Sequence, residues 1–567
     1  AGTEKREGED YELAKAVDGI DLIISGHSHS TLTEAVVVVV LLAALASYNA
    51  LVVVLIVAVF LPVGLLYSRV IRRRMAENGK EENRLQVSQN KTMFEALRGY
   101  ADIEIAGLTY DSRTASEGSC FFAVSGTVVD GHNYIAKAVE GGATAVICER
   151  IPEDVADLEC TFVVVDDSNL AMGVIASNFY GNPSHELKVV GVTGTNGKTT
   201  IATLLYDLVQ SMGYKAGLIS TVVYKVDNQS ITSTHTTPDT IRLNAMLAQM
   251  VECGCEYCFM ECSSHAIVQR RIYGINFAGA LFTNLTHDHL DYHKTFAEYI
   301  RAKKIFFDEL SKSSFAIVNC DDRNGEVMLQ NTAAKRLTLS LRRAADFNCK
   351  VMESTVEGTL LRIDGVDLWV SFLGRFNAYN LLTVYAAAIE LGFEKDEILR
   401  CISLLHPVDG RFDMVHAADS TTAIIDYAHT PDALENILKS VAEFRTPKQS
   451  VTVVCGCGGE RDKTKRPEMA QIAVKFADRA IFTADNPRSE DPEQILRDME
   501  AGVAVTDNYM KIVDRDNAIK TAVMLSAAGD IIVIAGKGHE TYQIIGTEKL
   551  PFNDKERVQY WFSTFNR

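Results

Sequence analysis

The glycine-rich segment GVTGTNGKTT, residues 191–200, carries the residues whose types and spacing point most directly to chemistry. It lies between an apolar run that predicts a buried strand and residues 201–212, where apolar side chains recur at helical spacing. Free backbone N–H groups and the helix dipole at the N-terminus of such a helix favour the binding of a phosphate group. Lys198 would reach the outer phosphates and Thr199 would hold Mg²⁺. Because Val192 stands where the usual pattern has its first glycine, a purely structural turn is the alternative.

A group of four cysteines offers a metal or iron–sulfur site as a second kind of chemistry. The group consists of Cys253, Cys255, Cys258 and Cys262. Residues 256–262 predict a buried strand that runs into a functional loop, so structural cysteines are the favoured interpretation. Cys455 and Cys457 flank a glycine in a turn and are interpreted in the same way.

Residues 282–296, FTNLTHDHLDYHKTF, bring three histidines close together in the chain. His287, His289 and His293 lie beside two aspartates, and from spacing alone this pattern indicates zinc.

The elements that must position these groups belong to a large, acidic chain. With 567 residues, the sequence predicts three or four domains. A net charge of −18 argues against a generic nucleic-acid-binding protein, although a pocket inside it can still be positive. The 12 cysteines in so long a chain indicate a reducing compartment, the cytosol.

Residues 35–67 are almost wholly apolar and exceed the roughly 20 residues that span a bilayer. One membrane span within residues 45–67 is the simplest interpretation, ahead of a tilted longer span or a tight hairpin. Arginines follow directly, and by the positive-inside rule they place the rest of the chain in the cytoplasm. Residues 35–74 are therefore a predicted transmembrane segment with a basic flank, and the polar residues 75–90 a linker.

The short acidic fragment at residues 1–34 resembles the strand and metal-binding loop of metallophosphoesterases. His27 and His29 would be the ligand pair. The other ligands that such an enzyme needs are absent from the sequence, which favours a remnant or a fusion over independent metal chemistry.

From residue 91 to the C-terminus, the motifs TGTNGKTT, HTTPDT, ECSSHAIVQRR and DNPR resemble those of the Mur ligases. The match is strongest to the branch that adds the third amino acid of the peptide. The resemblance implies an α/β fold with three domains, preceded here by the transmembrane helix. These are a small N-terminal domain that binds the UDP substrate (91–187), a central P-loop ATPase-like domain (188–405) and a Rossmann-like C-terminal domain that binds the amino acid (406–567).

The resemblance also implies where ATP and Mg²⁺ bind. The implied ATP-binding residues are Gly194, Thr195, Asn196, Gly197, Lys198, Thr199, Thr200, Asn377, Arg411 and Asp426. The implied Mg²⁺ ligands are Thr199, Glu261, His289 and Lys303, and the implied catalytic residues are Lys198, Glu261, His289 and Lys303. Lys303 is expected to be carbamylated, which turns a cation into a carboxylate-like anion that suits a hard metal. Lys304 is adjacent, so a shift of one position is open.

Two further groups are implied by the same resemblance. The UDP-substrate contacts are Tyr110, Ser112, Thr236, Thr237, Ser263, Gln269 and Arg271. The amino-acid contacts are Arg461, Asp485, Asn486, Pro487, Arg488, Gly536 and Glu540. The latter lie in loops after three apolar runs, and loops at the carboxyl ends of parallel strands should share one crevice. In this family the DNPR motif is typical of enzymes that use meso-diaminopimelate. Arg488 can bind the second carboxylate of diaminopimelate bidentately, whereas lysine has only a cationic amine at that end.

The activity implied is ATP-dependent addition of meso-diaminopimelate to UDP-N-acetylmuramoyl-L-alanyl-D-glutamate, through an acyl phosphate, in peptidoglycan synthesis. Four alternatives are weighed against it: the L-lysine-adding equivalent, a folylpolyglutamate synthetase, a membrane-tethered inactive scaffold, and a metallophosphoesterase fused to a ligase. The catalytic region is expected in the cytoplasm, anchored to the inner face of the membrane if residues 35–67 span it.

Overall fold

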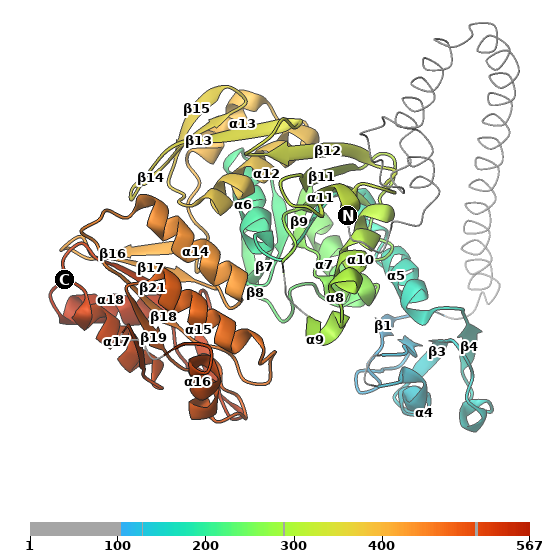
Figure 1. Ribbon diagram of the computed structural model, residues 1–567. Coiled ribbons are helices and arrows are strands. Elements are labelled where there is room, and N and C mark those ends of the chain that lie inside the picture. Colours follow the sequence, from blue (N-terminus) through green and yellow to red (C-terminus); the bar gives the residue numbers. More distant parts are fainter. Residues whose placement is uncertain (1–103, 127–128, 287–289, 505–507) are drawn as a thin grey trace, which may run out of the picture. The chain divides into compact units, whose positions relative to one another are not determined.

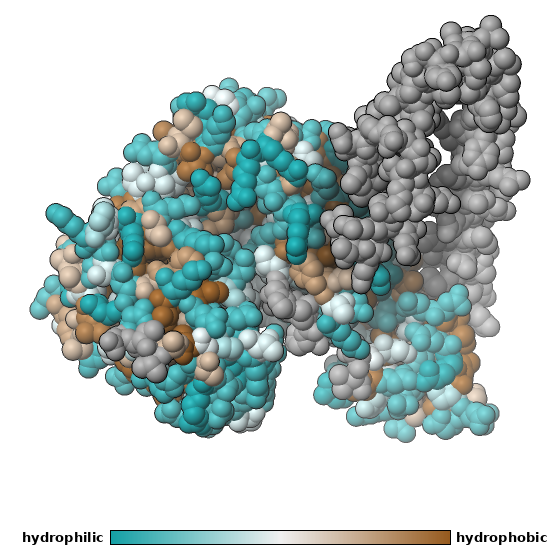
Figure 2. All heavy atoms as spheres, viewed as in Figure 1, coloured by the Kyte–Doolittle hydropathy of each residue, from teal (hydrophilic) through white to brown (hydrophobic). Residues whose placement is uncertain are grey.

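The computed structural model describes residues 104–126, 129–286, 290–504 and 508–567, which form three α/β domains (Figure 1). The expectations for residues 1–34, 35–74 and 75–90, and for His287 and His289, fall outside the described residues and stay predictions from the sequence. In the described part of the chain, no helix has the length and apolar character that a bilayer crossing requires. The face drawn in Figure 2 is mostly hydrophilic over these residues.

The N-terminal domain is built on a small parallel sheet in the order β1-β2-β3-β4. Its strands are β1 (Gly107–Thr109), β2 (Ser119–Phe122), β3 (Ala143–Cys148) and β4 (Thr161–Val164). Helix α4 (Ile135–Glu140) covers the sheet with a core that includes Phe121, Ile135 and Val146. Helix α5 (Ser168–Phe179) follows and packs against α7 (Thr240–Glu252) of the next domain.

The central domain contains a mixed sheet in the order β15-β14-β13-β12-β11-β10-β5-β9-β6-β7-β8. The parallel strands are β5 (Lys188–Thr193), β6 (Ala216–Ile219), β9 (Tyr257–Glu261), β10 (Phe277–Phe282), β11 (Phe315–Asn319) and β12 (Lys335–Ser340). The flanking strands are β7 (Val223–Val226), β8 (Gln229–Thr232), β13 (Phe347–Thr355), β14 (Gly358–Ile363) and β15 (Val366–Val370). Strand β13 starts parallel to β12, and the remaining flanking pairs are antiparallel.

Helices cover both faces of this sheet, which explains the nearly continuous apolar runs of its strands. One face carries α6 (Lys198–Ser211), α12 (Arg375–Leu391) and α13 (Lys395–Ile402), and the other carries α7, α8 (Ser264–Val268) and α10 (Phe296–Asp308). Two short helices, α9 (Leu290–His293) and α11 (Gly325–Met328), complete the domain. Val190 and Val192 face the α6 side and Val189 the other, as strand alternation requires.

The C-terminal domain has a sheet in the order β16-β17-β21-β18-β19-β20, parallel except for β16. Its strands are β16 (Asp413–His416), β17 (Thr422–Asp426), β18 (Val451–Cys455), β19 (Arg479–Phe482), β20 (Tyr509–Lys511) and β21 (Ile531–Ala535). Helices α14 (Pro431–Phe444), α15 (Lys465–Phe476) and α16 (Pro492–Glu500) pack on one face, and α17 (Arg515–Leu525) and α18 (Asp554–Thr564) on the other. A hairpin of β22 (Tyr542–Ile545) and β23 (Glu548–Pro551) follows β21.

Three local expectations from the sequence are confirmed by this fold. The helical spacing over residues 201–212 corresponds to α6, and the strand expected at residues 256–262 is the buried strand β9. The three strands whose loops were expected to share a crevice, β18, β19 and β21, are neighbours in one parallel sheet. Within the described residues, no group of three or more His, Cys, Asp or Glu side chains is arranged to hold a metal ion.

Candidate active site

The glycine-rich loop joins the end of β5 to the start of α6, at the carboxyl edge of the central sheet. Gly194 has φ +147°, and a side chain there would come within 1.9 Å of Thr283 Oγ1. Gly197 has φ +90°, and its substituent would meet Asn380 Oδ1 at 2.7 Å. Only glycine fits both positions, so the loop backbone lies close against its neighbours with the helix N-terminus open toward the cleft.

Lys198 is folded back over this loop. Its Nζ donates to the carbonyl oxygens of Gly194 at 3.0 Å and Thr195 at 2.7 Å. An ammonium group held at the mouth of a helix N-terminus is suited to meet an incoming phosphate.

Glu261, the last residue of β9, reaches the loop because β9 pairs directly with β5. Its side chain is only 1% exposed. Oε1 accepts hydrogen bonds from Thr199 Oγ1 at 2.8 Å and from the Thr221 N–H at 2.7 Å. Oε2 is buried and has no hydrogen-bond partner among the described residues. A buried carboxylate oxygen without a donor is costly, and a bound cation would compensate for it.

Lys303 lies on α10 and is buried below the loop, 1% exposed. Its Nζ donates to the Gly194 carbonyl at 2.8 Å and lies over the Tyr299 ring, 4.7 Å from its centre. Lys304, the neighbouring candidate, instead pairs with Asp308 on the surface of the helix. The structure therefore brings Lys303, rather than Lys304, to the phosphate loop.

The junction of the central and C-terminal domains contributes a guanidinium and a carboxyl group. Arg411 donates to Thr199 Oγ1 at 3.3 Å and lies over the Tyr427 ring. Asp426 accepts from the N–H groups of Phe412 and Ala428, both at 2.7 Å. Burial raises the pKa of Asp426 to about 6, although Arg411 and the two N–H donors act in the opposite direction.

Asn377 lies on the first turn of α12, one turn before Asn380. Its Nδ2 donates to the Leu373 carbonyl and its Oδ1 accepts from Asn380. Asn380 lines the cleft and Asn377 does not, so Asn377 is connected to the cleft only by its hydrogen bond with Asn380.

The expected UDP-substrate contacts of the central domain form one hydrogen-bonded group beside Glu261. Thr237 donates to the Glu261 carbonyl and accepts from the Ser263 N–H. Arg271 donates to the Thr237 carbonyl at 3.0 Å and to Gln269 Oε1 at 2.6 Å. Thr236 and Ser263 line the cleft directly. Hydroxyls and a guanidinium in this arrangement suit phosphate, sugar and carboxylate groups.

The N-terminal domain places Tyr110 and Ser112 at the end of its first strand. Tyr110 is 47% exposed and Ser112 is 9% exposed. Burial and the charge of Asp239 raise the pKa of Tyr110, while Arg271 lowers it. Tyr110 therefore lies within electrostatic reach of Arg271, one of the expected UDP-substrate contacts of the central domain.

A cleft of about 610 Å³ runs over the phosphate loop, and it contains residues Thr195 to Thr200 with Glu261, Lys303, Arg411 and Asp426. A second cleft of about 800 Å³ lies against the C-terminal sheet. The two share Thr236, Thr286, Tyr427, His429, Thr430 and Asp432. A group bound at the phosphate loop therefore borders directly on a molecule bound in the second cleft.

The second cleft is lined by the loops after β18, β19 and β21. Of the expected amino-acid contacts, Arg461, Asp485, Asn486, Arg488, Gly536 and Glu540 line it. Pro487 does not, but its carbonyl lies so close to Gly459 that a side chain on Gly459 would come within 1.9 Å.

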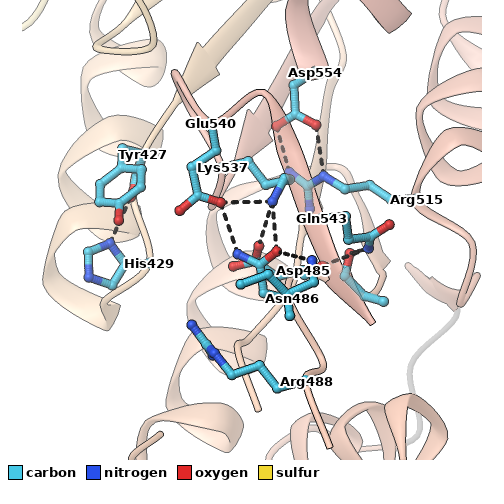
Figure 3. Close-up of polar contacts among 12 residues, drawn as sticks. Tyr427, His429, Asp485, Asn486, Arg488, Arg515, Lys537, Glu540, Gln543 and Asp554 are labelled. Atoms are coloured by element: carbon cyan, nitrogen blue, oxygen red, sulfur yellow. Dashed lines mark hydrogen bonds and ion pairs between the residues drawn. The ribbon is translucent and has the colours of Figure 1, made fainter. Parts of the chain in front are cut away.

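Residues 485–488 are held in place by the β22–β23 hairpin (Figure 3). Gln543 Nε2 donates to the Asp485 carbonyl at 2.6 Å, and the Ile544 N–H donates to Asn486 Oδ1 at 2.9 Å. Arg488 has φ +54° and exchanges backbone hydrogen bonds with Ile544 and Gly546. Its guanidinium donates to the Gly459 carbonyl at 2.6 Å. The hairpin thus fixes the backbone from which Arg488 projects.

Several residues of the site were missed by sequence reasoning. Asp432 accepts from Asn196 Nδ2 at 2.9 Å and so joins the phosphate loop to the C-terminal domain. Lys537 and Gln543 are hydrogen-bonded to residues among the expected amino-acid contacts. The signals for them were weak but present: Asp432 follows a Thr-Pro helix start, and Lys537 lies inside the GKGHE loop.

Comparison with known proteins agrees with this geometry. Three family descriptions match successive segments: "Mur ligase family, catalytic domain" over residues 104–180, "Mur ligase middle domain" over 192–388, and "Mur ligase, glutamate ligase domain" over 410–538. The UDP-N-acetylmuramoyl-L-alanyl-D-glutamate–2,6-diaminopimelate ligase of Cytophaga hutchinsonii is 51% identical over 479 residues, which cover 84% of this chain and 98% of that protein.

The chain belongs to the Mur ligase family.

Other Mur ligases extend the likeness. The protein of the same name from Phocaeicola vulgatus is 53% identical over 467 residues, covering 82% of this chain and 96% of its own. A solved structure of a UDP-N-acetylmuramoyl-L-alanyl-D-glutamate–2,6-diaminopimelate ligase aligns with a TM-score of 0.60 at 33% identity, over 81% of this chain and 95% of that one. MurF ligase from Thermotoga maritima, at 18% identity and a TM-score of 0.55, shares the fold.

The residues at the phosphate loop of this Mur ligase fit a magnesium ion. The Thr199 hydroxyl and the Glu261 carboxylate offer hard oxygen ligands, which Mg²⁺ prefers. The partnerless Oε2 of Glu261 is the observation that favours a cation at this place. His293, the one described member of the histidine cluster, donates to or accepts from Ser264 Oγ at 2.9 Å and is 5% exposed, as expected of a structural residue.

Proposed function

We propose that this Mur ligase joins 2,6-diaminopimelate to the D-glutamate carboxyl group of UDP-N-acetylmuramoyl-L-alanyl-D-glutamate at the expense of ATP, in peptidoglycan synthesis. The observation that carries the proposal is the meeting of two clefts at shared residues. One contains a phosphate loop, and the other contains an arginine and carboxylates in the DNPR and GKGHE loops. The names of the relatives that match nearly their whole length support the same substrates.

The phosphate-transfer end of the reaction is assigned to the central domain. The ATP-binding residues are Gly194 to Thr200 with Arg411 and Asp426, while Asn377 supports Asn380. Lys198 and Arg411 offset the charge that spreads over the transferring phosphoryl group as the D-glutamyl carboxylate attacks it. The first product is an acyl phosphate, because a free carboxylate is a poor acyl donor.

Magnesium would be held by Thr199, Glu261, His289 and carbamylated Lys303. When bound, it would neutralise phosphate charge. Thr199 and Glu261 are already oriented toward each other by their 2.8 Å hydrogen bond. Lys303 contacts the loop through its hydrogen bond to the Gly194 carbonyl. Carbamylation would replace its ammonium group by an anionic group whose oxygens are ligands of the kind that hard cations bind.

The UDP substrate is assigned to Tyr110, Ser112, Thr236, Thr237, Ser263, Gln269 and Arg271. These residues lead from the N-terminal domain to Glu261, so the dipeptide carboxylate would end beside the phosphate loop. The amino acid is assigned to the second cleft, where its amine would face the shared residues and attack the acyl phosphate. Domain limits of 91–187, 188–405 and 406–567 are proposed on the same grounds.

Selection of diaminopimelate over lysine is assigned to Arg488 and Glu540. The far end of diaminopimelate carries a carboxylate and an ammonium group, which a guanidinium and a carboxylate complement. Lysine carries an ammonium there without a carboxylate, and the guanidinium of Arg488 would repel it.

The test is phosphate release from ATP with Mg²⁺ and the UDP-muramoyl dipeptide, with meso-diaminopimelate or L-lysine as acceptor. Release that requires both the dipeptide and diaminopimelate is expected. If the enzyme released phosphate with L-lysine but not with diaminopimelate, the ligase reaction would stand and the role assigned to Arg488 would be rejected. A folded protein that releases phosphate with neither amino acid would favour the alternative of an inactive scaffold.

A further inference from the structure

Lys537 is a fully buried cation in the wall of the second cleft, 0% exposed. It lies in the loop after β21, next to Gly536. Its Nζ donates to Asn486 Oδ1 at 3.0 Å and to Glu540 Oε2 at 2.8 Å, and it lies 3.6 Å from Asp485 Oδ1 (Figure 3). Burying a lysine ammonium group in this way costs free energy unless it is hydrogen-bonded and paired with groups of opposite charge.

Lys537 also fixes how its polar neighbours face. Asn486 Oδ1 accepts from both Lys537 and the Ile544 N–H, which turns the amide Nδ2 toward Glu540 Oε2 at 2.9 Å. Oε2 of Glu540 thereby receives two donors. In Figure 3 the other carboxylate oxygen of Glu540 points away from this network, to the side of Tyr427 and His429. That oxygen is the one available to a bound ammonium group.

Lys537 makes the numbers of positive and negative charges equal in the loops at 485–488 and 536–540. The carboxylates there are Asp485 and Glu540, and the cations are Arg488 and Lys537. The nearby Arg515 is matched by its own partner Asp554, with both side chains 0% exposed and 2.8 Å apart. His539 is neutral at pH 7, because burial and the cations Arg411 and Lys537 lower its pKa to about 3.

Asp485 shows that the balance is local. Its Oδ1 is buried without a hydrogen-bond partner among the described residues, and Lys537 is the cation paired with it. Removal of the Lys537 charge would leave two carboxylates and one guanidinium in the loops at 485–488 and 536–540, while Glu460 and Arg461 of the neighbouring loop carry opposite charges that cancel. Such a wall would attract a lone ammonium group, which is the end that L-lysine presents.

We propose that Lys537 is a positioning and specificity-determining residue, which balances the charge of this wall so that it accepts a zwitterionic amino-acid end in preference to a lone ammonium. The inference rests on the proposed function and deepens it. Lys537 acts through Glu540 and Asn486, whereas Arg488 is the group assigned to the substrate carboxylate.

The test is the ratio of kcat/KM for diaminopimelate to kcat/KM for L-lysine in Lys537→Met. We expect the ratio to fall by at least about tenfold, chiefly through a higher KM for diaminopimelate. The KM for ATP and the formation of acyl phosphate without amino acid should stay as in the wild type. If Lys537→Met does not fold, Lys537→Gln, which keeps a donor but removes the charge, should give the same fall.

A compensating variant separates charge balance from a merely structural role. In Lys537→Met/Asp485→Asn the loops at 485–488 and 536–540 again carry equal numbers of positive and negative charges, one carboxylate and one guanidinium, so the ratio should recover in part. If Lys537 is only structural, the double variant will be no better than the single one. Lys549→Met, which removes an exposed lysine lying over Tyr542, is the matched control and should leave the ratio unchanged.

Two results would overturn the inference: an unchanged ratio in both single variants, or a double variant with no recovery. Failure of the proposed function itself would look different. In that case the wild-type protein would not use diaminopimelate at all, and the comparison of variants would fall with it.

Discussion

The phosphate loop and the DNPR wall hold their functional groups in place in different ways. The loop is one continuous stretch, shaped by glycine conformations and presented by a single strand and helix. The wall is assembled from residues 456–461, 485–488 and 536–546, and buried charges and a hairpin fix it. A backbone-shaped site depends little on its side chains for stability, whereas a side-chain network contributes to both stability and binding.

The contrast extends to unpaired groups. At the phosphate loop, Glu261 Oε2 has no hydrogen-bond partner among the described residues, as expected of an oxygen that would bind a cation. In the wall, the side chains of Asn486, Glu540 and Lys537 are hydrogen-bonded to one another. Asp485 Oδ1 also has no hydrogen-bond partner among the described residues, but the Lys537 ammonium group lies 3.6 Å from it and supplies the opposite charge. Substitutions at the loop should therefore impair turnover with little loss of stability, and substitutions in the wall should affect stability, amino-acid binding or both.

The largest effect is expected from breaking the buried pair below the wall. Arg515→Met leaves Asp554 as an uncompensated buried carboxylate and should lower the free energy of unfolding by about 3–5 kcal/mol. Urea unfolding measures it. Arg445→Met, which breaks an exposed pair with Asp478, is the control and should change stability by less than about 1 kcal/mol. Equal effects of the two variants would contradict the structural role given to the buried pair.

At the loop, Lys198→Ala should lower kcat about 10²–10³-fold, because it removes a preorganised cation that meets the transferring phosphoryl group. The midpoint of unfolding should stay within a few degrees of the wild type. Steady-state phosphate release and thermal unfolding give the two values. A variant that unfolds readily, or that keeps near-normal turnover, would break the contrast between loop and wall.

The sequence predicts these two regions to different depths. The loop could be recognised because its glycines, lysine and threonines are contiguous and a helical pattern follows them. The strand order that brings Glu261 beside Thr199 was inferable only from the family resemblance. Strands β5 and β9 start 69 residues apart in the chain, at Lys188 and Tyr257, and they become neighbours only through long-range pairing.

The wall was predictable only in outline. Its three loops were expected to share a crevice because they follow parallel strands, but Lys537, Gln543 and the Arg515–Asp554 pair carry no local signature. Their roles arise from tertiary contacts between segments far apart in the chain, which residue spacing does not reveal. The buried position of Lys303 was likewise invisible, since a helix lysine is ordinarily solvated.

A smaller effect, on the KM for diaminopimelate, should test whether the β22–β23 hairpin supports the wall. Gln543→Ala removes the 2.6 Å hydrogen bond to the Asp485 carbonyl and should raise the KM for diaminopimelate about tenfold, the cost of about one hydrogen bond. Acyl-phosphate formation without amino acid should be unaffected. If the KM for ATP rose as much as that for diaminopimelate, the hairpin would not be specific to the wall.

The smallest predicted effect concerns pH. His539 is held neutral, with its pKa lowered to about 3 from an ordinary value near 6.5, so the unfolded chain binds a proton more readily. Stability should therefore fall as pH decreases below about 6.5, by about 1 kcal/mol at pH 5.5 from this residue. The difference in unfolding free energy between pH 7.5 and 5.5 should shrink by that amount in His539→Gln. An unchanged difference would mean that the pKa of His539 is the same in the folded and unfolded states, which would contradict its lowered value.

The most direct test of the central claim follows the oxygen atoms of the D-glutamyl carboxylate. The dipeptide substrate is labelled with oxygen-18 in that group and incubated with ATP, Mg²⁺ and meso-diaminopimelate, and the released phosphate is analysed by mass spectrometry. The account predicts that one labelled oxygen passes to each phosphate, because the carboxylate attacks the γ-phosphate before the amine displaces it. Phosphate without label, formed together with the amide product, would contradict it.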